Sequence, residues 1–279
     1  MNRSEEIRQL IKLSVGEVKK RAGGHLLVLK SSDAIYTFFA EHMINTIQEN
    51  NEAHKDTAIV LPFGPVGQYP YFIEKVNKEK ISLASTWFFF MDEYADINGV
   101  EVHQNHPLSF RGRIFEMFKK IDKDLLPGYS KFIFPSCDNI YSLKEMVGEA
   151  NLCVTYGGIG IHGHIAFNEP EIGIRDTDPR IVQLNDFTVT FNTVWEGIGG
   201  NIENFPRKAL TLGMNQLFSA EKMIFFCRNG NKSLEWANTV LRLALLGKPG
   251  DDYPVTYLKE HKDWLVVTDE DTIRSPLSI

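Results

Sequence analysis

Short apolar runs alternate with amphipathic stretches along most of the chain, and this alternation predicts its elements. The run at 57–61 and the aromatic run at 86–91 are continuous, as expected of strands that are buried on both faces of a sheet. By the same criterion strands are predicted at 25–29, 57–61, 86–91, 131–134, 152–156, 209–212, 222–227 and 264–267.

Apolar residues at helical spacing separate most of these runs. The segment 4–21, for example, carries Ile7, Leu10, Ile11, Val15 and Val18 on one helical face. Helices are predicted at 4–21, 32–48, 69–78, 105–120, 142–150, 232–246 and 255–261. Residues 171–207 are polar with little periodicity and are expected to be irregular.

Strands that alternate with helices of ordinary length indicate βαβ units. We therefore predict an α/β fold with a mostly parallel, doubly wound sheet between two helical layers. The 279 residues contain no repeat, low-complexity tract or linker, so a single domain over 1–279 is expected, with 1–24 as an N-terminal helical extension.

Composition narrows the classes of function. The formal net charge is -6 and no run of Lys or Arg occurs, so nucleic acid is not an expected partner. Three scattered cysteines argue against a disulfide scaffold and for a reducing compartment. The polar start lacks a signal-peptide core, and no apolar run is long enough to span a membrane. A cytoplasmic protein without a membrane partner is expected.

Three motifs follow predicted strands, namely 62–67, Asp92-Glu93 and 157–169. In open α/β sheets the ligand crevice lies outside the carboxyl ends of the strands, so these motifs are expected to share one site. Asp92 follows an apolar strand, where desolvation raises a carboxyl pKa and favours a general base. Glu93 is interpreted instead as a helix-capping acid of the following loop.

His162, His164 and Glu169 lie within eight residues of one loop. One interpretation is acid–base catalysis, with the carboxylate orienting an imidazole. The other is a divalent metal site with two His ligands and one Glu ligand. Because the loop is glycine-rich and no further ligand is evident, acid–base chemistry is favoured and no metal is predicted.

Glycines at strand ends let a backbone approach a ligand and expose its N–H groups. On this ground Gly64, Gly158 and Gly160 are candidate substrate-binding residues. The run 157–160 lacks the Lys of a P-loop. It also comes late in the chain, whereas the glycine pattern of a dinucleotide-binding fold follows the first strand. Arg207, just before a predicted strand, is a candidate anion contact, with plain surface charge as its alternative.

Together these motifs resemble the glucosamine-6-phosphate deaminase/isomerase family, whose wider superfamily includes the 6-phosphogluconolactonases. The resemblance covers about residues 25–272 and rests on four segments in the same order. They are Met91-Asp92-Glu93-Tyr94, His106-Pro107-Leu108-Ser109-Phe110, Gly157-Gly158-Ile159-Gly160 with Gly163-His164-Ile165-Ala166-Phe167-Asn168-Glu169-Pro170, and Pro206-Arg207-Lys208-Ala209-Leu210-Thr211.

The resemblance implies a Rossmann-like fold and aldose–ketose chemistry on an amino-sugar phosphate, with release of ammonia. It makes Asp92 the base that moves a proton from carbon 2 to carbon 1. His164, held by Glu169, becomes the ring-opening acid–base, and Arg207 a contact of the substrate phosphate. It implies a small-molecule sugar phosphate as partner, with neither metal nor organic cofactor, and leaves a homo-oligomer open.

Two departures from the family pattern concern this site. His162 stands where the family has an acid, and an imidazole cannot serve as an anionic partner of His164. His162 is therefore itself a candidate acid–base. The loop 63–70 lacks the hydroxyls of the family's phosphate loop, and no second phosphate-binding Arg is evident around Thr188. The alternatives are a sugar lactone hydrolase, a non-catalytic sugar-phosphate-binding protein and a metallohydrolase.

Overall fold

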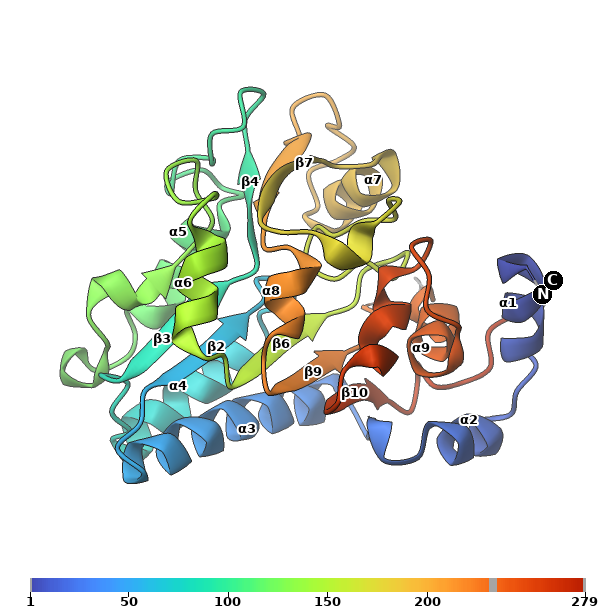
Figure 1. Ribbon diagram of the computed structural model, residues 1–279, viewed down its shortest axis with the longest axis horizontal. Coiled ribbons are helices and arrows are strands. Elements are labelled where there is room, and N and C mark those ends of the chain that lie inside the picture. The colour runs from blue at the N-terminus through green and yellow to red at the C-terminus, as the bar shows by residue number, and fades with distance from the viewer. Residues whose placement is uncertain (1, 231–234, 278–279) are drawn as a thin grey trace.

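Seven of the eight predicted strands form a parallel sheet in the order β1-β10-β9-β6-β2-β3-β5 (Figure 1). The eighth, predicted at 209–212, belongs to a second sheet. The computed structural model describes residues 2–230 and 235–277. The strands are β1 (Leu26–Leu29), β10 (Trp264–Asp269), β9 (Lys222–Phe226), β6 (Val154–Gly158), β2 (Thr57–Leu61), β3 (Thr86–Phe90) and β5 (Phe132–Ile133). The predicted α/β class is confirmed, since every pair of neighbours in this sheet is parallel.

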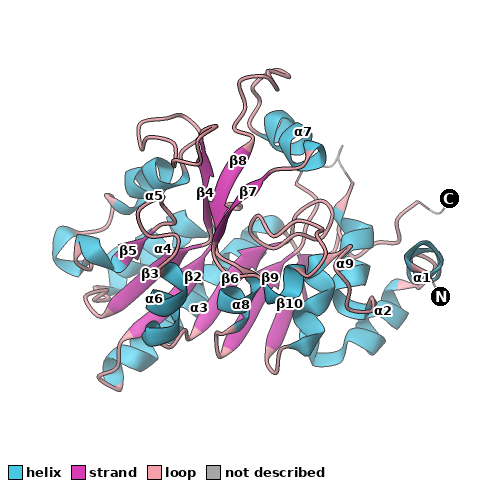
Figure 2. Ribbon diagram, turned by 45° about the horizontal axis from the view of Figure 1, so that its top comes forward, coloured by secondary structure: helices cyan, strands magenta, loops and turns pink. Residues whose placement is uncertain are grey.

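Helices cover both faces of this sheet (Figures 1 and 2). Successive side chains of a strand point to opposite faces, so Ala58 and Val60 of β2 join one core while Ile59 and Leu61 join the other. The first core contains α6 (Leu143–Ala150), α8 (Met214–Phe218) and α9 (Ala237–Leu246). The second contains α3 (Ser32–Glu52), α4 (Gln68–Glu79) and α5 (Phe110–Phe118).

A second, antiparallel sheet stands above the first and was not predicted (Figure 2). Its strands are β4 (Asp92–Ala95), β8 (Lys208–Thr211) and β7 (Arg180–Gln183), with α7 (Asp186–Trp195) beside them. The expectation that 171–207 is irregular is therefore wrong. Met91 alone separates β3 from β4. Its backbone N–H donates to the Leu61 carbonyl of the large sheet, and its carbonyl accepts the N–H of Leu212, the residue after β8. The carboxyl edge of the large sheet thus continues directly into the small sheet.

The predicted helix 4–21 is two helices, α1 (Arg3–Leu10) and α2 (Val15–Ala22). The break comes at Ser14, whose side chain and that of Glu17 form a capping box that starts α2. Both helices lie against α9. The expectation of a single domain with 1–24 as a helical extension stays a prediction.

Three other helices differ from their predictions in their first residue or in their type. The helix predicted at 105–120 begins at Phe110, because Ser109 is its N-cap. The segment predicted at 255–261 is the 3₁₀ helix Pro254–Glu260. The prediction of a helix over 232–246 falls partly on 231–234, outside the described residues, and α9 begins at Ala237.

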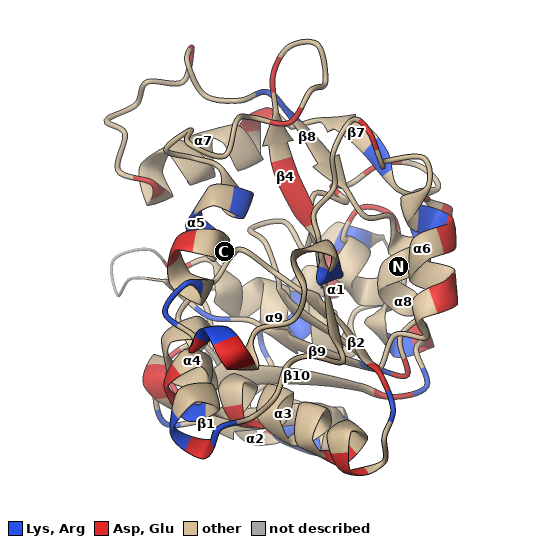
Figure 3. Cartoon of the chain, turned by 90° about the vertical axis from the view of Figure 1, so that its left-hand side faces the viewer, with Lys and Arg blue, Asp and Glu red and all other residues tan. Residues whose placement is uncertain are grey.

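Charges of both signs are mixed over the surface. Figure 3 shows Lys and Arg segments interleaved with Asp and Glu segments, and an acidic segment on β4, where Asp92 and Glu93 lie. Among the described residues, no helix combines the length and the apolar character that a membrane crossing requires.

Candidate active site

The three strand-end motifs contribute to one cavity with a volume of about 530 Å³. Gly64, in the loop after β2, and Asp92, the first residue of β4, line the cavity. Gly158 at the end of β6 also lines it, as do Gly160 and His164 in the following loop. This volume lies within the range of about 300–1,000 Å³ typical of small-molecule sites. Aromatic side chains of α7 and of the N-cap residue of α9 also line the cavity, namely Phe191, Trp195 and Trp236.

Asp92 is a buried carboxyl in the wall of this cavity, only 8% exposed. Burial, together with the neighbouring Glu93 carboxylate, raises the pKa of Asp92 to about 8. Within 2–230 and 235–277, no hydrogen bond reaches its carboxyl group to stabilise the charged form. A carboxyl with a pKa near neutrality is suited to taking up a proton and returning it.

Glu93 points away from the cavity and caps a helix. Its carboxylate accepts hydrogen bonds from the backbone N–H groups of Phe110 and Arg111, at 3.0 and 2.8 Å, and from the Ser109 hydroxyl at 3.0 Å. The two backbone donors belong to the N–H groups at the start of α5 that have no partner within the helix. The structure therefore agrees with the interpretation of Glu93 as a helix-capping acid.

We expect Glu93→Gln to lower the free energy of unfolding by about 1–3 kcal/mol, because one of the two buried acceptor oxygens becomes an N–H₂ donor that faces other donors. Urea denaturation at pH 7 measures this. The control is Glu116→Gln on the same helix, where an exposed glutamate pairs with Lys119. That change should stay within about 0.5 kcal/mol. Equal effects of the two substitutions would contradict the capping role.

The glycines after β6 make room for His164. A Cβ atom on Gly160 would lie 2.0 Å from Nε2 of His164, so only glycine permits this position of the ring. The Gly160 N–H also donates to the His164 carbonyl at 2.9 Å. Burial and the neighbouring His162 ring lower the pKa of His164 to about 3, so the imidazole is neutral at pH 7.

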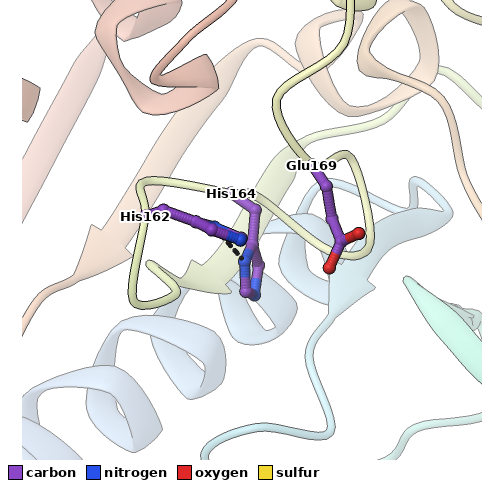
Figure 4. Close-up of side chains that lie close together, drawn as sticks. All are labelled: His162, His164 and Glu169. Carbon is purple, nitrogen blue, oxygen red and sulfur yellow. Dashed lines mark hydrogen bonds between the residues drawn. The ribbon is translucent and has the colours of Figure 1, made fainter. Parts of the chain in front are cut away.

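His164 forms its side-chain hydrogen bond with His162, and none with Glu169 among the described residues. The two Nδ1 atoms lie 3.1 Å apart, as the dashed line in Figure 4 shows. Nε2 of His162 lies 2.7 Å from the side-chain nitrogen of Asn185. Glu169 accepts the Asn185 backbone N–H at 2.8 Å, and burial raises the pKa of Glu169. The expectation that Glu169 holds His164 is thus not met by a direct hydrogen bond.

Ligand atoms of His162, His164 and Glu169 lie within 4.8 Å of one another, close enough for a metal site. A histidine that ligates a metal usually donates its other ring N–H to an acceptor. At His162 the other nitrogen faces the Asn185 side-chain N–H₂ group, which is a donor. The oxygen of that amide accepts the Thr188 backbone N–H at 2.9 Å, which fixes the orientation of the amide. This arrangement favours proton chemistry over metal ligation.

The loop after β2 is packed against the glycine loop. A Cβ on Gly158 would lie 2.7 Å from the Gly64 carbonyl oxygen, so these two glycines allow close contact of the loops. Phe63 stacks on Phe110 at a centroid distance of 4.3 Å. The guanidinium of Arg113 lies 5.4 Å from the centre of the Phe63 ring. This part of the cavity is therefore aromatic.

Arg207 does not belong to the residues that line the cavity. It pairs with Asp186 at 2.8 Å at the start of α7. Two arginines that the sequence analysis missed do line the cavity, Arg113 and Arg228. Arg113 pairs with Glu196 through two hydrogen bonds of 3.0 and 2.8 Å. Arg228 contacts Tyr36 and Ser32 and has no carboxylate partner within 2–230 and 235–277.

The sequence offered only a weak signal for these residues. Arg228 lies two residues after the end of the apolar strand β9, just as Asp92 lies two residues after the end of β3. Asn185 is far from His162 along the chain and meets it only through the fold. It is the N-cap of α7, a helix that the polar stretch 171–207 did not reveal.

Comparison with known proteins places this chain in a family. No family model matches the chain. A glucosamine-6-phosphate deaminase of Aliivibrio salmonicida is 29% identical over 254 residues, which cover 88% of this chain and 90% of the relative. One from Caenorhabditis elegans is 30% identical over 217 residues, 75% of this chain and 78% of the relative. The chain belongs to the glucosamine-6-phosphate deaminase family.

Solved structures agree on the fold of this family member. A monomeric glucosamine-6-phosphate deaminase superimposes with a TM-score of 0.75 at 22% identity, covering 88% of this chain and 98% of the other. A 6-phosphogluconolactonase from Thermotoga maritima gives a TM-score of 0.59 at 16% identity, with 88% and 98% covered. The expected Rossmann-like fold of the deaminases and lactonases is therefore confirmed.

Proposed function

We propose that this enzyme converts a hexosamine phosphate, glucosamine 6-phosphate or a close relative, into a ketose phosphate and ammonia. The observation that carries the proposal is Asp92, a buried carboxyl with a pKa near 8 in the same cavity as the His164 imidazole. The curated relatives are named for deamination of glucosamine 6-phosphate, and their sequences align with most of this chain.

The proton balance assigns a task to Asp92. In the open-chain aldose the Asp92 carboxylate takes the proton from carbon 2, and the electron pair forms a double bond to carbon 1 while charge moves to the carbonyl oxygen. Asp92 then returns the proton to carbon 1, one ammonium proton ends on that oxygen, and carbon 2 becomes an iminium. Water adds to carbon 2 and ammonia leaves. No oxidant or metal is required in this sequence.

The test is ammonia release over a panel of hexosamine 6-phosphates, with unphosphorylated glucosamine included. Turnover of at least one hexosamine phosphate is expected. A lactone-opening assay on the same preparation tests the hydrolase alternative. Thermal stabilisation by a sugar phosphate without any turnover would instead support a non-catalytic binding protein and contradict the proposal.

Arg228 is our candidate for the contact of the substrate phosphate. Of the two arginines in the cavity wall, Arg113 is neutralised by Glu196, whereas Arg228 contacts only neutral groups among the described residues. The altered loop at Phe63 and Pro65 offers few hydroxyl or N–H donors, so a guanidinium supplies the charge that a phosphate requires.

We expect Arg228→Met to raise KM for the phosphorylated substrate by about 10- to 100-fold, because a charged hydrogen bond contributes about 1.5–3 kcal/mol. The matched control is Arg207→Met, which removes an arginine outside the cavity wall and should leave KM within about twofold. Steady-state kinetics on both variants measure this. A larger effect of the Arg207 variant would assign the phosphate to Arg207 instead.

A further inference from the structure

His162 stands where the family pattern has an acid. Its presence decides which ring nitrogen of His164 carries the proton. Four polar groups form a chain from α7 to the cavity, namely the Thr188 backbone N–H, Asn185, His162 and His164. The direction of each hydrogen bond in this chain follows from the one before it, starting from a backbone group whose role is fixed.

The Thr188 N–H donates to the side-chain oxygen of Asn185 at 2.9 Å, since Asn185 is the N-cap of α7. The amide nitrogen of Asn185 therefore faces Nε2 of His162, 2.7 Å away, and donates to it. Nε2 of His162 must then be the acceptor, so this imidazole is neutral and carries its proton on Nδ1.

The same logic extends to His164. Nδ1 of His162 donates to Nδ1 of His164 across 3.1 Å, so Nδ1 of His164 is the acceptor. A neutral His164 consequently carries its proton on Nε2. No hydrogen bond of the described residues involves that nitrogen, and the ring lines the cavity.

We infer that Asn185 and His162 are positioning residues that hold His164 as an Nε2–H donor toward the substrate. An acid at position 162 would accept from Nδ1–H of His164 and leave Nε2 bare, ready to take a proton. Because Nε2 of His164 is already protonated here, it cannot take a proton from the substrate at the start of the reaction. Resting on the proposed function, the inference gives His164 the task of donating a hydrogen bond to the carbonyl oxygen as charge develops on it. A neutral imidazole is known to act in this way in another sugar-phosphate isomerase.

The test is nitrogen-15 NMR of histidine-labelled full-length protein at pH 7, which distinguishes protonated from bare ring nitrogens. Signals are assigned with the His162→Gln and His164→Gln variants. The expected result is a proton on Nδ1 of His162 and on Nε2 of His164. A bare Nε2 on His164 in the wild type would overturn the inference. A proton on Nε2 of His162 would also overturn it. That proton is expected if both rings bound a metal through Nδ1, or if the oxygen of the Asn185 amide faced His162.

Two variants test the chain itself. In His162→Asp we expect the His164 proton to move from Nε2 to Nδ1. In Asn185→Asp, which keeps an N-cap for α7, we expect a proton to appear on Nε2 of His162. A purely structural role of Asn185 would leave the ring signals of His162 unchanged and would contradict its positioning role.

These spectra require no turnover, so they separate two kinds of failure. Absence of ammonia release from every hexosamine phosphate would overturn the proposed function while the spectra still decide the position of the proton. Where turnover is present, His164→Gln keeps an N–H donor and should retain at least tenfold more kcat than His164→Ala. Equal kcat values for the two variants would contradict the donor role.

Discussion

Asp92→Asn is expected to lower kcat by about 100- to 10,000-fold, the range for loss of a positioned general base. The amide has nearly the shape of the carboxyl but cannot carry a proton from carbon 2 to carbon 1. Ammonia release from the substrate found in the panel measures the loss. An Asp92→Asn variant with near wild-type kcat would assign the proton transfer to another group.

The same substitution should stabilise the fold at alkaline pH. Burial raises the Asp92 pKa from 3.8 to about 8, so the wild-type chain is most stable below the unfolded pKa and loses that contribution as pH rises toward 8. Asparagine does not titrate. The stability of Asp92→Asn relative to wild type should therefore increase between pH 4 and pH 8, by on the order of a few kcal/mol. Urea denaturation across this pH range measures the change.

The second large effect is expected from Gly160→Ala. The added Cβ would lie 2.0 Å from Nε2 of His164, so the imidazole must leave its place in the cavity wall. Because a displacement of about 1 Å can cost about 100-fold in rate, kcat/KM should fall by at least about 100-fold. The backbone of Gly160 does not have a positive φ, so alanine is not excluded by backbone conformation.

The matched control for Gly160→Ala is Gly148→Ala in α6, where a Cβ would meet nothing within 4 Å. This exposed helical position should tolerate alanine or gain up to about 1 kcal/mol. Retained activity in Gly160→Ala with an intact fold would show that His164 does not need the observed position.

Strands buried on both faces were the best predicted part of the fold. The apolar run Thr57–Leu61 is a strand with the predicted bounds, since all five of its residues are buried. The small antiparallel sheet escaped prediction because β4 is short and begins with two acidic residues. Helix α7 escaped for a different reason. Its buried positions include Thr188 and Thr193, while Phe187 and Val194 are exposed, so the apolar periodicity that marks a packed helix is absent.

In the candidate site, too, the residues at the ends of buried strands were predicted, and the contacts that depend on helix packing were not. Asp92 and His164 follow strand ends in a parallel sheet, and the edge of such a sheet brings them to one cavity regardless of the loops between them. The contact between His162 and Asn185 depends on where α7 docks, which no local pattern states. Arg207 and Arg228 are both arginines beside strands, and only the fold distinguishes the one that reaches the cavity.

The measurement that most directly tests the central claim is conversion of glucosamine 6-phosphate in D₂O by wild type and Asp92→Asn. We predict release of ammonia and formation of a ketose phosphate. This product carries deuterium on carbon 1 in those turnovers in which the proton on Asp92 exchanges with D₂O before Asp92 returns it. The Asp92→Asn variant should give neither product at a comparable rate. Wild-type protein that binds the sugar phosphate without releasing ammonia, or that releases it equally well without Asp92, would contradict the account.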